Sequence, residues 1–355
     1  MTDFDFSLIG KKVWNRYKAC NLPAEYTTIL VHYGALRLAE VTGDGAMRQE
    51  LLDRLEPYWK GQVPKVGGHY GQYDYRFGGN ASAWALFQGY LGKDAEESLC
   101  KTCEDLIALQ PRYENKIFCQ RKWHDLTPGE WGFRWIDTVF GVCPFLLWIG
   151  LKCNKPHFID EAAAQMRYHH ELLFDPACNL YHQAIDARLP EITPGHWGRG
   201  VGWALHALTD LAGELPGDHK EYSSIVSWYR MTVDGCLNFQ DKEGMWHQNV
   251  DDFGTFPEVS GTGLILYALG KGIRNGIFTD EKYLTAFRRG IVALMGYVGL
   301  DGSVHHCCGG CCCPGYNGTA ADYEARGHIL NDSHSFGPVT LACSEAEALK
   351  RAGKL

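Results

Sequence analysis

Two kinds of helix-length segment alternate along the chain. Segments of the first kind are apolar and rich in glycine and alanine, and segments of the second kind are amphipathic and more highly charged. The apolar segments span residues 26–41, 80–91, 133–150, 199–212, 260–273 and 335–349. Their charged partners span residues 47–59, 95–109, 158–174, 221–239, 281–298 and, completing the last pair, 4–20. This repetition predicts about six helical hairpins.

The connections after three of the charged segments also resemble one another. Residues 175–182, 241–247 and 301–305 each begin with a turn-forming aspartate and end with a histidine. Loops of one kind are expected to emerge on one face of a repeat architecture. We therefore predict an all-α fold, an (α/α)6 barrel in a single domain over residues 1–355, with a pocket at one end. An open helical solenoid is the alternative, and the repeat count disfavours it.

Composition narrows the class of protein. The 355 residues include 11 Trp, 18 Tyr and 16 Phe, which suits stacking on sugar rings. A formal charge of −8 argues against nucleic acid or a membrane surface as partner. The N-terminal sequence MTDFDFSLIGKK lacks the features of a secretory signal, and the 14 cysteines are expected to be thiols in a reducing compartment. These features predict a cytoplasmic protein.

One carboxylate stands within the third apolar segment. Asp137 is the only ionised side chain between Arg134 and Lys152. Burial of an unpaired carboxylate is costly and raises its pKa, which makes it a usable proton donor near neutral pH. Asp137 is therefore a candidate general acid, and a buried acid that caps a neighbouring element is the alternative.

A second candidate site is the sequence HWGRGVGW, residues 196–203, at the expected start of the fourth apolar helix. Its three glycines leave the backbone bare beside Arg199, whose planar guanidinium matches a carboxylate. The N–H groups of a helix N-terminus also favour an anion. Trp197 and Trp203 offer stacking faces, so the run indicates a site for an acidic sugar. The alternative is a structural ion pair of Arg199 at a glycine-rich helix entry.

Five motifs together resemble a known family of enzymes. They are WxD at 135–137 followed by PFL at 144–146, LYH at 180–182, WxRGxGW at 197–203, EVSGT at 258–262 and NDSHSFGPVTLACSE at 331–345. In this order they resemble the unsaturated uronyl hydrolases. The match is closest to the unsaturated rhamnogalacturonyl hydrolases of glycoside hydrolase family 105, followed by the related unsaturated glucuronyl hydrolases of family 88.

The resemblance implies an (α/α)6 barrel that acts on the 4,5-unsaturated uronic acid left by a polysaccharide lyase at the non-reducing end of an oligosaccharide. In that family the aspartate of WxD protonates the double bond and water adds at C5, after which the hemiketal opens and the next sugar leaves. Asp137 matches this proton donor. The resemblance implies no metal and no organic cofactor. The positions that match sugar-contacting residues are Trp135, His182, Trp197, Arg199, Gly200 and Trp203.

The chain departs from the family at the second acidic residue. The family has an aspartate just before the second apolar helix. Here Asp74 lies a few residues early, and Asn80 stands near the family position. Either residue is a candidate partner for the attacking water.

A cysteine-rich loop, HHCCGGCCCPG at residues 305–315, is the other departure. Cys308 and Cys311 have the spacing of a zinc knuckle. Five cysteines crowd into seven positions, however, which favours a packed or redox-sensitive loop. Five further residues are candidates for the pocket, although a helix cap or a hairpin tie is the simpler interpretation of each. They are His32, His206, Glu258, Asp332 and His334.

The leading hypothesis is therefore a hydrolase of unsaturated uronyl oligosaccharides. A polysaccharide lyase or sugar epimerase on a similar helical toroid would need a tyrosine or histidine base instead of the WxD acid. A non-catalytic scaffold organised on the cysteine-rich loop would bind metal and would have no need of the two tryptophan motifs.

Overall fold

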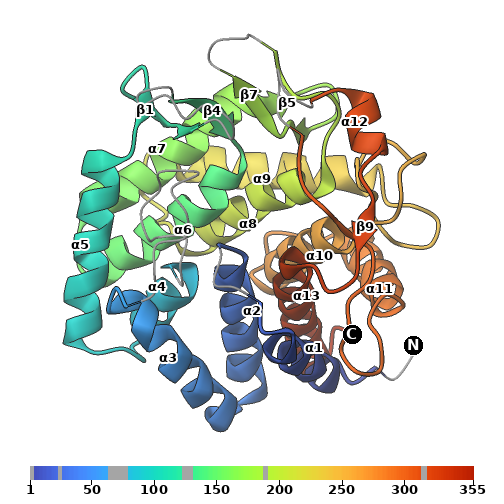
Figure 1. Ribbon diagram of the computed structural model, residues 1–355, viewed down its shortest axis with the longest axis horizontal. Coiled ribbons are helices and arrows are strands. Elements are labelled where there is room, and N and C mark those ends of the chain that lie inside the picture. Colours follow the sequence, from blue (N-terminus) through green and yellow to red (C-terminus); the bar gives the residue numbers. More distant parts are fainter. Residues whose placement is uncertain (1–3, 23–25, 63–78, 122–130, 187–190, 313–317) are drawn as a thin grey trace.

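The computed structural model describes residues 4–22, 26–62, 79–121, 131–186, 191–312 and 318–355. Within these ranges, helices form two concentric layers (Figure 1). The inner ring consists of α2 (Tyr26–Thr42), α4 (Gly79–Phe87), α6 (Asp137–Lys152), α8 (Gly198–Glu214), α10 (Val259–Arg274) and α13 (Ser333–Arg351). Each inner helix contacts the next in this order and α13 contacts α2, so the ring is closed.

The outer helices each pack on inner helices next to them in the chain. They are α1 (Phe6–Cys20), α3 (Gly45–Trp59), α5 (Lys93–Leu109), α7 (Pro156–Leu173), α9 (Tyr222–Leu237) and α11 (Glu281–Met295), and a short α12 (Ala320–Glu324) lies in a connection. α1 pairs with α13, as the sequence predicted for the two ends of the chain. The (α/α)6 barrel is confirmed and the open solenoid is wrong.

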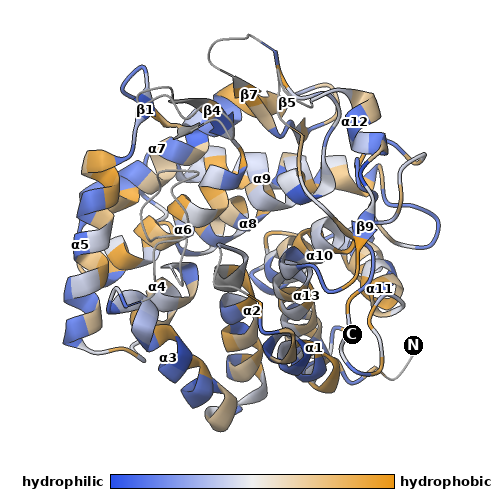
Figure 2. Ribbon diagram, in the orientation of Figure 1, coloured by the Kyte–Doolittle hydropathy of each residue, from blue (hydrophilic) through white to orange (hydrophobic). Residues whose placement is uncertain are grey.

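The difference between the two layers follows from burial. Residues 137–150 of α6 are all buried, because this helix is covered on every side. On α5 the buried residues form a single stripe of Ala95, Leu99, Cys103 and Leu106. Hydrophilic residues are accordingly prominent on α1, α3 and α5, and hydrophobic ones on α6 (Figure 2). In the described part of the chain, no helix combines the length and apolarity that a bilayer crossing requires.

Short antiparallel strand pairs decorate the barrel, and several gather along one edge of it (Figure 1). The strands are β1 (Arg112–Tyr113) with β2 (Ile117–Phe118), β3 (Gln120–Arg121) with β4 (Trp131–Trp135) and β7 (Ala184–Asp186), β5 (Phe174–Asp175) with β6 (Leu180–Tyr181), and β8 (Cys307–Cys308) with β9 (His328–Ile329). The expectation of helix from residue 133 is wrong for residues 133–135. This aromatic run pairs with β7 as the middle strand of its sheet, and the helix begins at Asp137.

The connections divide by length between the two ends of the ring. From an inner helix to its outer partner the chain needs only a few residues, such as 153–155 between α6 and α7. From an outer helix to the next inner helix most paths are longer, such as residues 174–197 and 296–332. Every long path ends where an inner helix begins. The strands and the N-terminal ends of the inner helices therefore share one end of the barrel.

Candidate active site

Asp137 is the first residue of α6 and follows directly on β4 and Ile136. The Ile136 N–H donates to the backbone carbonyl of Gln183 (3.0 Å), which fixes the helix entry against the segment before β7. The Gln183 side-chain amide donates to Asp137 Oδ2 at 2.5 Å. Only 7% of Asp137 is exposed. The structure thus places this carboxyl group in a buried position at the N-terminal end of the barrel, oriented by a neutral donor.

Gly200, in the first turn of α8, makes room for that donor. A Cβ atom at position 200 would lie 2.3 Å from Gln183 Oε1. The glycine predicted to contact the sugar therefore also allows Gln183 to approach α8 while its amide nitrogen reaches Asp137.

Arg199 lies beside Gly200 and is 1% exposed. Its Nη1 donates to Ser260 Oγ (3.1 Å) and to the Cys308 carbonyl (2.9 Å). Burial opposes the charge of Arg199, but the side chains of Cys307, Cys308 and Glu258 around it outweigh burial and raise its pKa. Among the residues that the structure describes, no carboxylate forms an ion pair with this guanidinium. The hydrogen-bond partners of this buried cation are thus neutral, and the described ranges contain no ion pair of Arg199.

The three candidate tryptophans are all buried near the same end of the barrel. Trp197 donates its indole N–H to Cys308 Sγ (3.4 Å), and the Arg199 guanidinium carbon lies 4.4 Å from its ring centre. Trp203 is one turn further into α8 and stacks on Phe140 with ring centres 4.1 Å apart. Trp135 packs with hydrophobic neighbours on β4 and β7. Trp197 thus lies directly against the Arg199 guanidinium.

Glu258 is the N-cap of α10 and holds the cysteine-rich loop. Its carboxylate accepts from the N–H groups of Ser260 (3.0 Å) and Gly261 (2.6 Å), and from the N–H of Cys308 (3.0 Å). This is the capping interpretation given above. Cys308 and Cys311 belong to no group of three metal-ligand side chains within the described ranges. The loop instead packs around Trp197.

Asp332 and His334 form the N-terminal turn of α13. The Asp332 side chain caps the helix and lies 2.6 Å from His334 Nδ1, while His334 Nε2 hydrogen-bonds the hydroxyl of Tyr26 at the start of α2. Burial and the charge of Arg199 lower the pKa of His334. Burial alone would raise the pKa of Asp332, but its contacts with His334 outweigh burial and lower it to about 2. A tyrosine, a histidine and an aspartate are thus linked in series near Arg199.

His182 and Asn80 are placed at the same end. His182 Nδ1 lies 3.1 Å from the Gly195 carbonyl, and burial with the neighbouring His196 ring lowers the pKa of His182. Asn80 is fully buried and donates to the carbonyl of Phe140 (2.7 Å) in the first turn of α6. Asp74, the other candidate for the second acidic position, lies outside the described residues.

Two of the further candidates lie away from this end. His32 packs among the rings of Trp14, Tyr17 and Tyr58, on the side of α2 that faces outer helices. His206 is two turns into α8 and fully buried within the ring. Both are core histidines.

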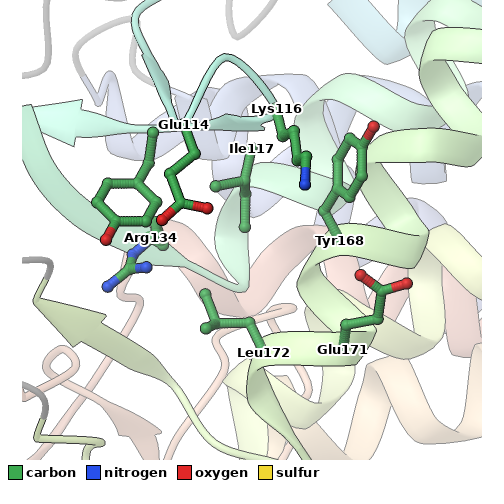
Figure 3. A pocket seen from close by; sticks show the side chains of 8 residues that line it. Glu114, Lys116, Ile117, Arg134, Tyr168, Glu171 and Leu172 are labelled. Carbon is green, nitrogen blue, oxygen red and sulfur yellow. The ribbon is translucent and has the colours of Figure 1, made fainter.

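A pocket of about 180 Å³ opens on the outer side of β4, between β1, β2 and α7 (Figure 3). Side chains of Glu114, Lys116, Arg134, Tyr168 and Glu171 surround it. Arg134 alternates with Trp135 along the strand, so the two side chains point to opposite faces. This pocket contains none of the predicted site residues.

Comparison with known proteins decides the family. A model described as Glycosyl Hydrolase Family 88 matches residues 8–350. The chain belongs to this family. A solved structure of a family 105 glycoside hydrolase from C. acetobutylicum ATCC 824 superposes with a TM-score of 0.81 at 21% identity, covering 96% of this chain and 99% of that one. The resemblance inferred from the motifs is confirmed at the level of the family and the fold.

Curated relatives of this family 88 chain match over part of their length. The unsaturated rhamnogalacturonyl hydrolase YesR of Bacillus subtilis (strain 168) is 25% identical over 213 residues, which are 59% of this chain and 58% of the relative. The unsaturated 3S-rhamnoglycuronyl hydrolase of Alteromonas sp. (strain LOR) is 27% identical over 199 residues, which are 55% of this chain and 46% of the relative. The chain spans about half the length of these relatives.

Sequence reasoning missed two residues of this family 88 site. Gln183 directly follows the LYH motif, yet nothing in its sequence context marks it as the partner of Asp137. Tyr26 stands at the start of the first apolar segment, where an aromatic residue is unremarkable. Both contacts depend on how the ring closes.

Proposed function

We propose that this family 88 chain removes a 4,5-unsaturated uronic acid from the non-reducing end of oligosaccharides produced by polysaccharide lyases. The observation that carries the proposal is that two buried groups stand at the starts of adjacent inner helices. Asp137 opens α6 and is oriented by a neutral amide. Arg199, in the first turn of α8, is a buried cation that lacks a carboxylate partner among the described residues.

These groups suit an acid-catalysed hydration. Asp137 gives its proton to C4 of the double bond, and the oxocarbenium-like charge that develops at C5 is captured by water. The water returns a proton to the Asp137 carboxylate, and the hemiketal opens to a ketone at C5 and a hemiacetal at C1. Collapse of the hemiacetal releases the next sugar with the glycosidic oxygen. Arg199 binds the uronate carboxylate, and six inner-helix N-termini at the same end favour that anion. Trp197, His182 and Trp203 border the same region.

The replacement Asp137→Asn tests the proton donor. Loss of general acid catalysis should lower kcat by about 10²–10⁴-fold, because an amide cannot supply the proton. The assay follows loss of the ultraviolet absorbance of an unsaturated uronyl disaccharide. Asp53→Asn, an exposed acid on α3, is the matched control and should leave kcat unchanged. Activity retained by Asp137→Asn removes this residue from the role.

A panel of substrates tests the finer assignment. Lyase products of rhamnogalacturonan, pectin, ulvan and glycosaminoglycans share the unsaturated uronate and differ in the following sugar. Turnover of one class at a kcat/KM well above the others assigns the following sugar. No loss of the double-bond signal with any of them contradicts the proposed reaction.

The Tyr26–His334–Asp332 series favours one second candidate, a polysaccharide lyase. A tyrosine hydroxyl hydrogen-bonded to a histidine is a suitable base for removing the proton next to a uronate carboxylate. A lyase acting on the intact polymer creates the absorbance that a hydrolase removes. The two activities therefore give opposite signs in the same assay, and a non-catalytic scaffold gives neither.

We also expect the protein to act in a reducing compartment such as the cytoplasm. In support, Cys103, Cys143 and Cys236 are thiols that pack within the hydrophobic core.

A further inference from the structure

A cluster of metal-ligand side chains lies between the β5–β6 hairpin and the segment that precedes α8. Cys178 Sγ is 3.5 Å from His196 Nε2, and His196 Nε2 is 3.5 Å from Asp175 Oδ2. One ligand atom from each of these three residues falls within 4.8 Å of the others. His182 Nε2 lies 3.9 Å from the same Asp175 oxygen. Asp175 Oδ1 accepts from the N–H of Ala177 (2.8 Å), which turns Oδ2 toward the two rings.

Hydrogen bonds on the far sides of the rings leave both Nε2 atoms as lone-pair donors. His196 Nδ1 lies 2.8 Å from Asp251 Oδ2, and a carboxylate only accepts, so Nδ1 carries the proton. His182 Nδ1 likewise donates to the Gly195 carbonyl (3.1 Å). In its neutral form, each ring presents the lone pair of Nε2 to the Asp175 carboxylate. The Cys178 thiol lies against the same atoms, and a cation would take the place of its proton.

The alternative cation is a proton on His196, which would make an ion pair with both carboxylates. The ring centres of His182 and His196 are 4.5 Å apart, so a charge on one ring disfavours a charge on the other.

The separations suit zinc. With Zn–N and Zn–O bonds of about 2.0–2.1 Å, a Zn–S bond of about 2.3 Å and tetrahedral angles, ligand atoms lie roughly 3.3–3.6 Å apart. The thiol-to-imidazole and imidazole-to-carboxylate distances both have this value, at 3.5 Å. Asp251 stands where a carboxylate commonly supports a zinc-bound histidine from its other nitrogen. A mixed set of thiolate, imidazole and carboxylate also favours zinc over magnesium or calcium.

We propose that Asp175, Cys178 and His196 form a zinc site whose fourth position faces His182. Binding displaces the thiol proton of Cys178 to solvent and forms a Zn–S bond, with no change of oxidation state. The metal joins the β5–β6 hairpin to the residue before Trp197, so it stabilises the wall of the candidate active site. The proposal stands independently of the reaction proposed above.

Cobalt titration tests the site without reference to activity. Chelator-treated full-length protein, titrated with Co²⁺, should bind one ion per chain, with tetrahedral ligand-field bands and a thiolate-to-cobalt charge-transfer band. Zinc should displace it. Cys178→Ser should abolish the charge-transfer band, and Asp251→Asn should weaken zinc binding by about 10–100-fold without removing the band.

Cys311→Ser is the matched control, because it removes a thiol from the cysteine-rich loop and leaves the cluster intact. A charge-transfer band in the wild type and Cys311→Ser that is absent in Cys178→Ser supports the proposal. A band that survives in Cys178→Ser, a band lost in Cys311→Ser, or no stoichiometric binding overturns it. If Cys178→Ser does not fold, unchanged zinc affinity in Asp251→Asn overturns it instead.

Discussion

Buried charges are treated differently at the two ends of the inner ring. Toward the C-terminal ends of the helices, Asp210 accepts from Lys271 Nζ (2.7 Å) and from the Tyr267 hydroxyl (2.6 Å). In the same layer Glu345 accepts two hydrogen bonds from Arg274, each at 3.0 Å. We call these residues the C-terminal layer. Each of its buried carboxylates has a cationic partner.

We call Asp137, Arg199 and their neighbours the N-terminal layer. Within the described chain, no carboxylate forms an ion pair with Arg199. Asp137 is bound by the Gln183 amide, and Arg199 by Ser260 and a backbone carbonyl. Placing a charge in a protein interior costs several kcal/mol unless a counter-charge or good hydrogen bonds compensate. In the C-terminal layer, cationic side chains neutralise the buried carboxylates, so this layer has a structural role. In the N-terminal layer, the charge of Arg199 is available to neutralise an anionic ligand.

Of the replacements considered, Lys271→Met should have the largest effect, and this effect should be on the free energy of unfolding. It leaves Asp210 buried without its cation, which costs about 3–5 kcal/mol. Urea unfolding measures the loss. Lys282→Met, which breaks the exposed pair with Asp234, should cost no more than about 1 kcal/mol. Equal losses in the two variants would remove the distinction between buried and exposed pairs here.

The pH dependence of stability should follow from His206, beside the C-terminal layer. Burial lowers the pKa of His206 to about 4, despite the nearby Asp210. An unfolded imidazole has a pKa of about 6.5, so the unfolded chain binds a proton that the folded chain excludes. His206 by itself should therefore lower the free energy of unfolding by about 2–3 kcal/mol as pH drops from above about 6.5 toward 4.

Replacement of His206 by Gln should flatten that part of the stability curve. The exposed His157, replaced in the same way, is the control. Urea unfolding at a series of pH values provides the measurement. An identical slope in wild type and His206→Gln would contradict the assignment.

Arg199→Lys should affect activity more than stability. Lysine keeps the charge but loses the planar fork that binds a carboxylate through two hydrogen bonds, so kcat/KM should fall by about 10–100-fold. Arg274→Lys in the C-terminal layer is the counterpart. It should lower the unfolding midpoint and leave kcat/KM near the wild-type value. The comparison of layers fails if both replacements act mainly on stability.

Gly200→Ala should have the smallest effect, and this effect should be on kcat. The new methyl group displaces the Gln183 amide, and Asp137 loses the hydrogen bond that orients it. We expect about a tenfold fall in kcat and little loss of stability, because alanine favours the helix. Gly45→Ala, which meets nothing within 4 Å, is the control. Unchanged kcat in Gly200→Ala would show that Gln183 does not position the acid.

The sequence by itself determined the six hairpins and the candidate residues at the starts of α6 and α8. Helical periodicity and helix-entry glycines are local signals, so they can be recognised without knowledge of the tertiary structure. Only the tertiary structure decided that Asp137 meets Gln183, 46 residues away, and that Tyr26 meets His334, 308 residues away. It also decided that residues 133–135 form a strand and that Cys178 lies next to His196. These outcomes depend on ring closure and strand pairing between distant segments, and no local pattern encodes them.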